Sequence, residues 1–278
     1  MLEPEEFFAL EAFEHRDVFR TDEVVWSALD RLQGYLEALF AGRGPLRGHT
    51  GQVEQRPLVI FEGEARQDLE VRSTGPGGTL QAFKGAEPLD GASIVLPGAY
   101  LFDDRILIGT NTLIEPGALV RGPAVIGSRT EIRQGAYIRG DCIVGNRCVV
   151  GHTTEIKSSI MLDGAKAGHF AYIGDSILGN DVNLGAGTKL ANLKMIPGTV
   201  SIRSGKEQLD TGRRKIGAIL GDRTETGCNS VTSPGTLMGP QSIVYPGVAV
   251  PAGHYPGRTV VMPSRDSLRI HTLKTRNP

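Results

Sequence analysis

The sequence predicts a mainly β protein whose central part is a stack of triangular coils built from short parallel strands. The main observation is a six-residue repeat, in which twelve consecutive positions carry a large apolar residue. These positions are Leu96, Phe102, Ile108, Ile114, Val120, Ile126, Ile132, Ile138, Val144, Val150, Ile156 and Leu162. A glycine often follows the apolar residue, and the position four residues after it is mostly small. The third observation is a low aromatic content of 6%, so the core must be built from aliphatic residues.

A period of six residues fits neither an α-helix, with its period of 3.6, nor a simple alternating strand. It fits a coil of three short strands, with eighteen residues per coil, whose successive turns stack about 4.8 Å apart. The apolar register returns less regularly after Leu162, at Ile173, Leu178, Leu184, Leu190, Leu220, Thr226, Thr232, Met238, Val244 and Val250. We place the first break between Gly168 and Tyr172, and such local breaks are typical of functional sites.

The flanks of the repeat predict the domain organisation. Residues 22–41 have helical apolar spacing, so residues 1–45 are predicted to form a helical cap over the open end of the stack. Residues 46–93 are an irregular β lead-in, and the coils occupy 94–256. Within them, 194–217 reads as a protruding loop or hairpin, and 257–278 is a polar C-terminal tail.

Composition excludes several functional classes. A net charge of −1 and a pI near 6.6 argue against binding to nucleic acid or to a membrane surface. The chain has no apolar run of about 18 residues that could span a membrane, and its acidic start does not resemble a secretory signal. Three cysteines argue against a disulfide scaffold and favour a reducing compartment, so we expect a cytoplasmic protein.

Eighteen-residue spacing places three cations, Arg121, Arg139 and Lys157, in one column on neighbouring strands. Like charges directly opposite one another repel, so the column predicts a bound anion such as a phosphate. The alternative is a solvated face that is compensated by Glu155, by Asp141 or by a neighbouring chain.

His169 lies at the predicted register break, near the cation column and three residues before Tyr172. An imidazole with an ordinary pKa near 6.5 suits proton removal from an amine, so His169 is the candidate general base. His152 could approach His169 across adjacent coils, but two histidines without a third ligand make a poor zinc site, and we predict no metal.

Residues 155–192 resemble the acetyltransferase half of bacterial bifunctional glucosamine-1-phosphate acetyltransferase/N-acetylglucosamine-1-phosphate uridylyltransferases. The resemblance rests on E-x-K, K-A-G-H-x-x-Y-x-G-D and V-N-x-G-A-G-T, followed by an Asn. The run TGRRKIGA (211–218) is more similar to archaeal-type sugar-1-phosphate nucleotidylyltransferases with an acetyltransferase tail. The resemblance implies a left-handed parallel β-helix of hexapeptide repeats and a homotrimer with sites between subunits. The family's N-terminal nucleotidylyltransferase domain is not recognisable here.

Position by position, the resemblance implies that His169 is the general base and that Arg139 and Lys157 bind the sugar phosphate. The sugar-contacting positions are Glu155, Tyr172, Asn183 and Asn192. For acetyl-CoA, the resemblance implies that Cys228 and Tyr245 lie near the thioester and the CoA arm. We expect a backbone N–H near Gly187 or Cys228 to stabilise the oxyanion, and Arg265 is one candidate for the CoA phosphates. The chain departs from the family pattern at Leu193, Cys228, Tyr245 and Pro246, which affects the donor and sugar specificity more than the base.

The sequence therefore predicts an acetyl-CoA-dependent N-acetyltransferase that acts on a hexosamine 1-phosphate, most simply glucosamine 1-phosphate, in the synthesis of nucleotide sugars such as UDP-N-acetylglucosamine. One alternative is a non-catalytic trimeric assembly or ligand-binding subunit for a separate sugar-1-phosphate nucleotidylyltransferase. A second is a γ-class carbonic anhydrase-like metalloenzyme on the same scaffold.

Overall fold

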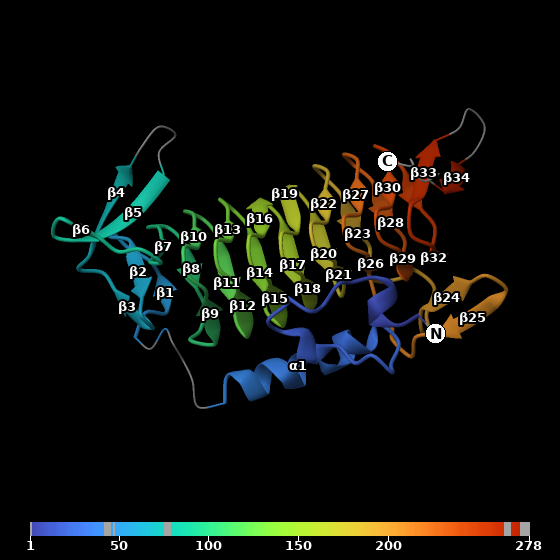
Figure 1. The fold of residues 1–278 in the computed structure, drawn as a ribbon, viewed down its shortest axis with the longest axis horizontal. Coiled ribbons are helices and arrows are strands. Elements are labelled where there is room, and N and C mark those ends of the chain that lie inside the picture. The colour runs from blue at the N-terminus through green and yellow to red at the C-terminus, as the bar shows by residue number, and fades with distance from the viewer. Residues whose placement is uncertain (1, 42–45, 47, 75–78, 264–267, 273–278) are drawn as a thin grey trace.

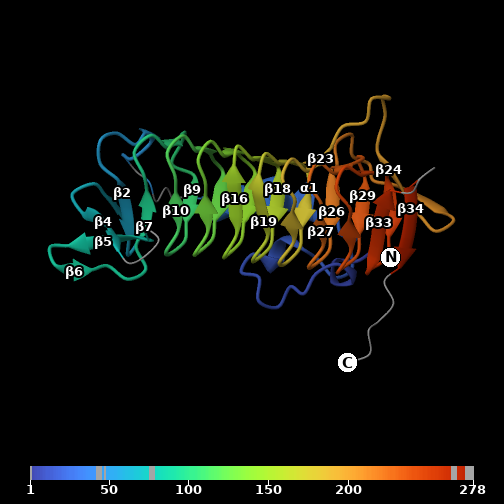
Figure 2. The ribbon, with the colours of Figure 1, turned by 90° about the horizontal axis from the view of Figure 1, so that it is seen from above.

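The computed structural model describes residues 2–41, 46, 48–74, 79–263 and 268–272, and it shows one elongated solenoid of stacked β-strands (Figure 1). Three long sheets form the three faces of the solenoid, and strands within the stack pair in parallel, as predicted. Viewed from above, successive strands lie side by side along the long axis (Figure 2). The mainly β architecture of parallel coils is therefore confirmed.

The bounds of the strands define the three faces. Face A contains β1 (Gly51–Gln52), β8 (Tyr100–Leu101), β11 (Leu119–Arg121), β14 (Tyr137–Arg139), β17 (Glu155–Lys157), β20 (Tyr172–Gly174), β23 (Lys189–Leu190), β28 (Val231–Thr232) and β31 (Ala249–Val250). Face B contains β3 (Glu64–Arg66), β2 (Leu58–Phe61), β7 (Ser93–Val95), β10 (Leu113–Ile114), β13 (Glu131–Ile132), β16 (Val149–His152), β19 (Lys166–His169), β22 (Asn183–Leu184), β27 (Glu225–Thr226), β30 (Ile243–Val244), β33 (Thr259–Pro263) and β34 (Leu268–Thr272). Face C contains β9 (Ile106–Ile108), β12 (Ala124–Ile126), β15 (Cys142–Val144), β18 (Ser159–Met161), β21 (Ile177–Leu178), β26 (Ala218–Leu220), β29 (Thr236–Met238) and β32 (Gly253–Tyr255).

The interior of the solenoid is a column of aliphatic side chains, as the repeat predicts. Ile114, Ile132 and Val150 stack in register on face B, and each is fully buried. Three of the twelve predicted inward positions are wrong by one residue, because Val95, Leu101 and Met161 point inward in place of the residues that follow them. Phe102, for example, is 40% exposed, whereas Leu101 is fully buried.

The register break lies earlier than the sequence predicted. Face A and face C are joined by two residues, Gly140 and Asp141, in one coil but by Ser158 alone in the next, so Ser159 pairs with Cys142 at a spacing of seventeen. Ser158 adopts a left-handed conformation with φ 45°, which lets a single residue turn the corner. His169 consequently pairs with His152, seventeen residues earlier, and not with Gly151, which an even spacing of eighteen would give.

The N-terminal segment does not cap the end of the stack. It contains η1 (Pro4–Glu6), η2 (Arg16–Val18) and one α-helix, α1 (Ser27–Leu39), and it runs along the side of the coils (Figure 1). Its apolar residues pack in one cluster with the outward side chains of face C, which include Val125, Ile143, Ile160, Ile177, Ile219 and Leu237. The predicted end cap is therefore wrong, because face C offers the segment an apolar surface along its length.

Beside the six-residue repeat, the sequence contains a second pattern that explains why the N-terminal segment packs on face C. The strands of face C read AVI, CIV, SIM, AIL and TLM, so an outward aliphatic residue precedes the inward one. On the other two faces most of the equivalent outward residues are polar or only partly buried, as at Glu131 and Tyr137. One face with apolar side chains pointing both ways indicates that a further segment covers it.

Antiparallel strands cover the two ends of the stack. At the N-terminal end, β2 and β1 pair with β7 and β8 of the first coil, and β4 (Glu70–Thr74), β5 (Thr79–Lys84) and β6 (Glu87–Pro88) form a separate small sheet. At the other end β34 pairs with β33, so regular strands continue past residue 256. Residues 194–217 contain the hairpin of β24 (Ser201–Ser204) and β25 (Glu207–Asp210). Among the described residues, no helix has the length and apolarity needed to cross a membrane.

Stability of the N-terminal segment is expected to fall as the pH falls below about 6.5. Burial lowers the pKa of His15, whose Nδ1 lies 2.9 Å from the Tyr35 hydroxyl, and burial likewise lowers the pKa of His254. Below the ordinary histidine pKa these histidines bind protons more readily in the unfolded chain than in the folded chain. Their contribution to stability is therefore complete above pH 6.5 and is lost as the pH falls through the folded pKa. Denaturant titrations of the wild type and of His15→Gln between pH 7.5 and 5 measure this, and the variant is expected to lose part of the pH dependence. An unchanged slope in the variant would remove His15 as the cause.

Candidate functional site

The predicted cation column is present at the edge where face A meets face C. Arg121 and Arg139 pair directly in register, and Lys157 ends the next strand. Each cation has a partner within the chain. The Arg121 guanidinium lies 4.7 Å from the centre of the Phe102 ring. Arg139 Nη1 donates to Glu155 Oε1 at 2.6 Å.

Lys157 is paired with Asp175, an acid that lies eighteen residues further along the chain. Its Nζ lies 2.9 Å from Asp175 Oδ2, and both side chains are largely buried. The positive charge of the column is thus compensated by Glu155, which the alternative allowed, and by Asp175. Asp141 takes part in neither of these ion pairs. The Lys157 ammonium group carries three N–H donors, and Asp175 takes one of them.

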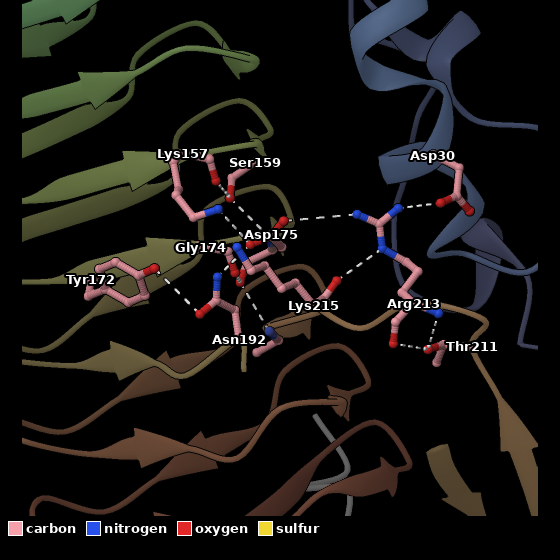
Figure 3. A network of polar contacts seen from close by, with 12 residues as sticks. Asp30, Lys157, Ser159, Tyr172, Gly174, Asp175, Asn192, Thr211, Arg213 and Lys215 are labelled. Atoms are coloured by element: carbon pink, nitrogen blue, oxygen red, sulfur yellow. Dashed lines mark hydrogen bonds and ion pairs between the residues drawn. The ribbon is translucent and has the colours of Figure 1, made fainter. Parts of the chain in front are cut away.

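Asp175 also joins two further residues that the resemblance places at the sugar (Figure 3). The Asn192 side-chain amide donates to Asp175 Oδ2, and the Tyr172 hydroxyl lies 3.4 Å from Asn192 Oδ1. The structure therefore brings Lys157, Tyr172 and Asn192 together in one cluster at the end of face A. Asp175 is the last letter of the K-A-G-H-x-x-Y-x-G-D run, so the motif itself held the signal.

His169 lies at the opposite edge of face A, where face B ends. Its side chain is exposed, and Phe170 follows it with φ 52°. The carbonyl of His169 accepts the backbone N–H of Gly187 at 2.9 Å, so this N–H is not free to donate to an oxyanion, contrary to the expectation for Gly187. His152 stacks beneath His169, and its Nδ1 lies 2.9 Å from the Gln134 carbonyl oxygen.

The imidazole and the cations are separated by the width of face A. The strand from Ala171 to Gly174 leads from the His169 corner to the position paired with Lys157, a rise of roughly 10 Å. Tyr172 lies on this path, and its hydroxyl reaches toward the cation edge. A ligand that contacts both His169 and Lys157 of one chain must therefore lie along face A, over Tyr172.

Other predicted site residues lie elsewhere. Asn183 is exposed on face B, paired with Lys166 and Glu225, away from the Tyr172 cluster. Cys228 is exposed at the same corner as His169, two coils further along. Tyr245 is 45% exposed, and its N–H donates to the Val261 carbonyl. Arg265 lies outside the described residues.

Two of the three cysteines lie in the core of the solenoid. Burial raises the pKa of the Cys142 and Cys148 thiols to about 12, so both behave as neutral side chains of the core. Within the described part of the chain, no group of three His, Cys, Asp or Glu side chains is arranged to hold a metal ion.

Comparison with known proteins places this geometry in a family. Residues 120–229 match the family model of the GMPPB C-terminal domain. Over 155 residues the chain is 36% identical to the putative uncharacterized acetyltransferase YaiX of Escherichia coli, which covers 54% of this chain and 67% of that protein. The chain belongs to the hexapeptide-repeat acyltransferase family.

Two further proteins are similar to parts of this chain. Over 101 residues this hexapeptide-repeat protein is 39% identical to the bifunctional sugar-1-phosphate nucleotidylyltransferase/acetyltransferase of Sulfurisphaera tokodaii, covering 36% of this chain and 25% of that protein. The chain thus spans about a quarter of the length of that relative. Among solved structures, the UDP-N-acetylglucosamine acyltransferase of Campylobacter jejuni is 18% identical with a TM-score of 0.43, covering 64% of this chain and 74% of that chain.

Proposed function

We propose that the protein is an N-acetyltransferase that moves an acetyl group from acetyl-CoA to the 2-amino group of a hexosamine 1-phosphate. The observation that carries the proposal is the layout of face A, which has an exposed histidine at one edge and the Lys157, Tyr172 and Asn192 cluster at the other. A hexosamine 1-phosphate carries an amine and a phosphate, the two groups that these edges are proposed to contact. Glucosamine 1-phosphate is the proposed substrate, which places the reaction in nucleotide-sugar synthesis.

The chemistry follows from this layout. Arg139 and the unused donors of Lys157 hold the phosphate, and Tyr172 and Asn192 orient the sugar ring between the two edges. The amine attacks the thioester carbonyl carbon while His169 accepts the amine proton, and the C–S bond then breaks. The products are the N-acetylated sugar phosphate and the CoA thiol, which takes the proton back from the imidazolium.

Assembly and location complete the proposal. Face A of one chain is open to solvent along Tyr137, Tyr172 and Val231, and we propose that copies of a homotrimer flank it, as the family resemblance implies. The three cysteines are free, which fits a reducing compartment, and we place the enzyme in the cytoplasm. A separate nucleotidylyltransferase that uses the product is the proposed downstream partner.

A thiol-release assay with acetyl-CoA and glucosamine 1-phosphate tests the activity, with galactosamine 1-phosphate and free glucosamine as comparison substrates. Turnover with a sugar phosphate, and little turnover with free glucosamine, is expected. Absence of thiol release with both sugar phosphates would reject the enzyme. If the purified protein also fails to bind acetyl-CoA in calorimetry and co-purifies with a nucleotidylyltransferase, the assembly-subunit alternative gains support.

Replacing Lys157 with methionine is expected to raise the KM for glucosamine 1-phosphate by about 10- to 100-fold, because a charge-assisted hydrogen bond contributes roughly 1.5–3 kcal/mol. The matched control is Lys166→Met, an exposed lysine on face B, for which KM should stay within threefold. Equal effects of the two substitutions would contradict a phosphate site at the cation column.

A further inference from the structure

Asp175 is a buried carboxylate on which several side chains converge (Figure 3). The residue is 5% exposed and lies at the corner between β20 and β21. Its Oδ2 accepts from Lys157 Nζ on the preceding coil and from the Asn192 amide on the following coil. One carboxylate therefore joins residues from three successive coils of the solenoid.

This arrangement fixes the geometry of the two neighbours. A buried carboxylate is costly unless it is paired and hydrogen-bonded, so the contacts to Lys157 and Asn192 are favoured at the same time. With the Asn192 nitrogen committed to Asp175, its oxygen is turned toward the Tyr172 hydroxyl. The ammonium of Lys157 is likewise held in place, with its side chain 17% exposed.

Arg213 approaches the same carboxylate from the insertion after β23. Its Nη2 lies 4.0 Å from Asp175 Oδ1, and its Nη1 forms an ion pair with Asp30 of helix α1. The guanidinium is further fixed by a hydrogen bond from Nε to the Lys215 carbonyl at 3.1 Å. Arg213 thus connects the coil, the insertion and the N-terminal segment, which are distant in sequence.

We propose that Asp175 is a positioning residue for the sugar-phosphate site, and that Arg213, held by Asp30, steadies its carboxylate from the other side. The proposal rests on the function proposed above. Asp175 contacts no part of the reacting centre in this scheme and acts by holding Lys157 and Asn192 in their binding orientation. Preorganised donors spare the ligand the cost of ordering them, so the effect belongs to binding.

Kinetics of Asp175→Asn provide the first test. The amide keeps the size of the side chain but removes the charge that orders Lys157, so the KM for glucosamine 1-phosphate is expected to rise about 10- to 100-fold with kcat within threefold. Asp163→Asn is the matched control, because Asp163 is a similarly buried corner carboxylate that accepts from the Asn146 backbone. An unchanged KM, or a fall in kcat at constant KM, would overturn the positioning role.

A second test needs no turnover, so it separates this proposal from the proposed function. Brief treatment with an amine-acetylating reagent, followed by peptide mass spectrometry, measures the accessibility of each lysine. In Asp175→Asn the modification of Lys157 is expected to increase severalfold over the wild type, while the exposed Lys84 and Lys166 serve as internal references. Equal modification of Lys157 in both proteins would reject the claim that Asp175 holds it, whether or not the protein transfers acetyl groups.

The link to the N-terminal segment has its own test. Asp30→Asn and Arg213→Gln are each expected to raise Lys157 modification less than Asp175→Asn does. Because both substitutions break the same ion pair, the double variant should show no more modification than the stronger single variant. Additive effects would show that Asp30 and Arg213 act independently, which contradicts the proposed connection.

Discussion

Replacing His169 with alanine is expected to lower the kcat of acetyl transfer by about 10²- to 10⁴-fold, the usual contribution of a general base. The imidazole is exposed at the end of β19, so its removal should leave the fold intact. Steady-state kinetics with acetyl-CoA and glucosamine 1-phosphate measure the loss, and thermal unfolding with size-exclusion chromatography confirms that folding and assembly are unchanged.

His152 provides the matched control for this variant. It stacks directly on His169 one coil earlier, and its Nδ1 lies close to the Gln134 carbonyl oxygen. His152→Ala is expected to keep kcat within threefold, because this ring is not proposed to meet the amine. If His152→Ala lost as much activity as His169→Ala, or if His169→Ala kept most of its activity, the assignment of the base would be wrong.

Replacing Gly151 with alanine is expected to destabilise the protein by about 3 kcal/mol, at the upper end of the cost of overpacking a well-packed site. A Cβ at this position would lie 1.8 Å from the Gly168 carbonyl oxygen, which is backbone and cannot rotate away. The coils that carry His152 and His169 would have to separate, so activity should fall together with stability.

Gly168 is the natural control, because a Cβ there would meet no atom within 4 Å. Gly168→Ala is therefore expected to change the free energy of unfolding by less than about 1 kcal/mol, the usual size of a Gly-to-Ala change at a compatible site. Denaturant unfolding of the two variants measures the difference. Similar stabilities for Gly151→Ala and Gly168→Ala would show that the coils are packed less closely here than the structure indicates.

Several features of the site could be predicted from the sequence because they depend on spacing along the chain. Arg121 and Arg139 are eighteen residues apart, and the regular coil between them places them side by side in register. Lys157 and Asp175 are also eighteen residues apart, so the same spacing extends the column to this acid, although the shortened corner makes Gly174 the backbone partner of Lys157. The position of His169 over His152 depends on the same shortened corner.

The sequence by itself determined the coil, because a repeating aliphatic residue specifies an inward face wherever the backbone adopts that repeat, as at Ile132 and Ile138. Only the tertiary structure decided where the N-terminal helix packs and that the imidazole and the cations occupy opposite edges of face A. The six-residue repeat indicates which side chain of each strand is buried. The packing of the N-terminal helix and the placement of the site residues also depend on a corner turned by one residue and on contacts between segments that are far apart in the sequence.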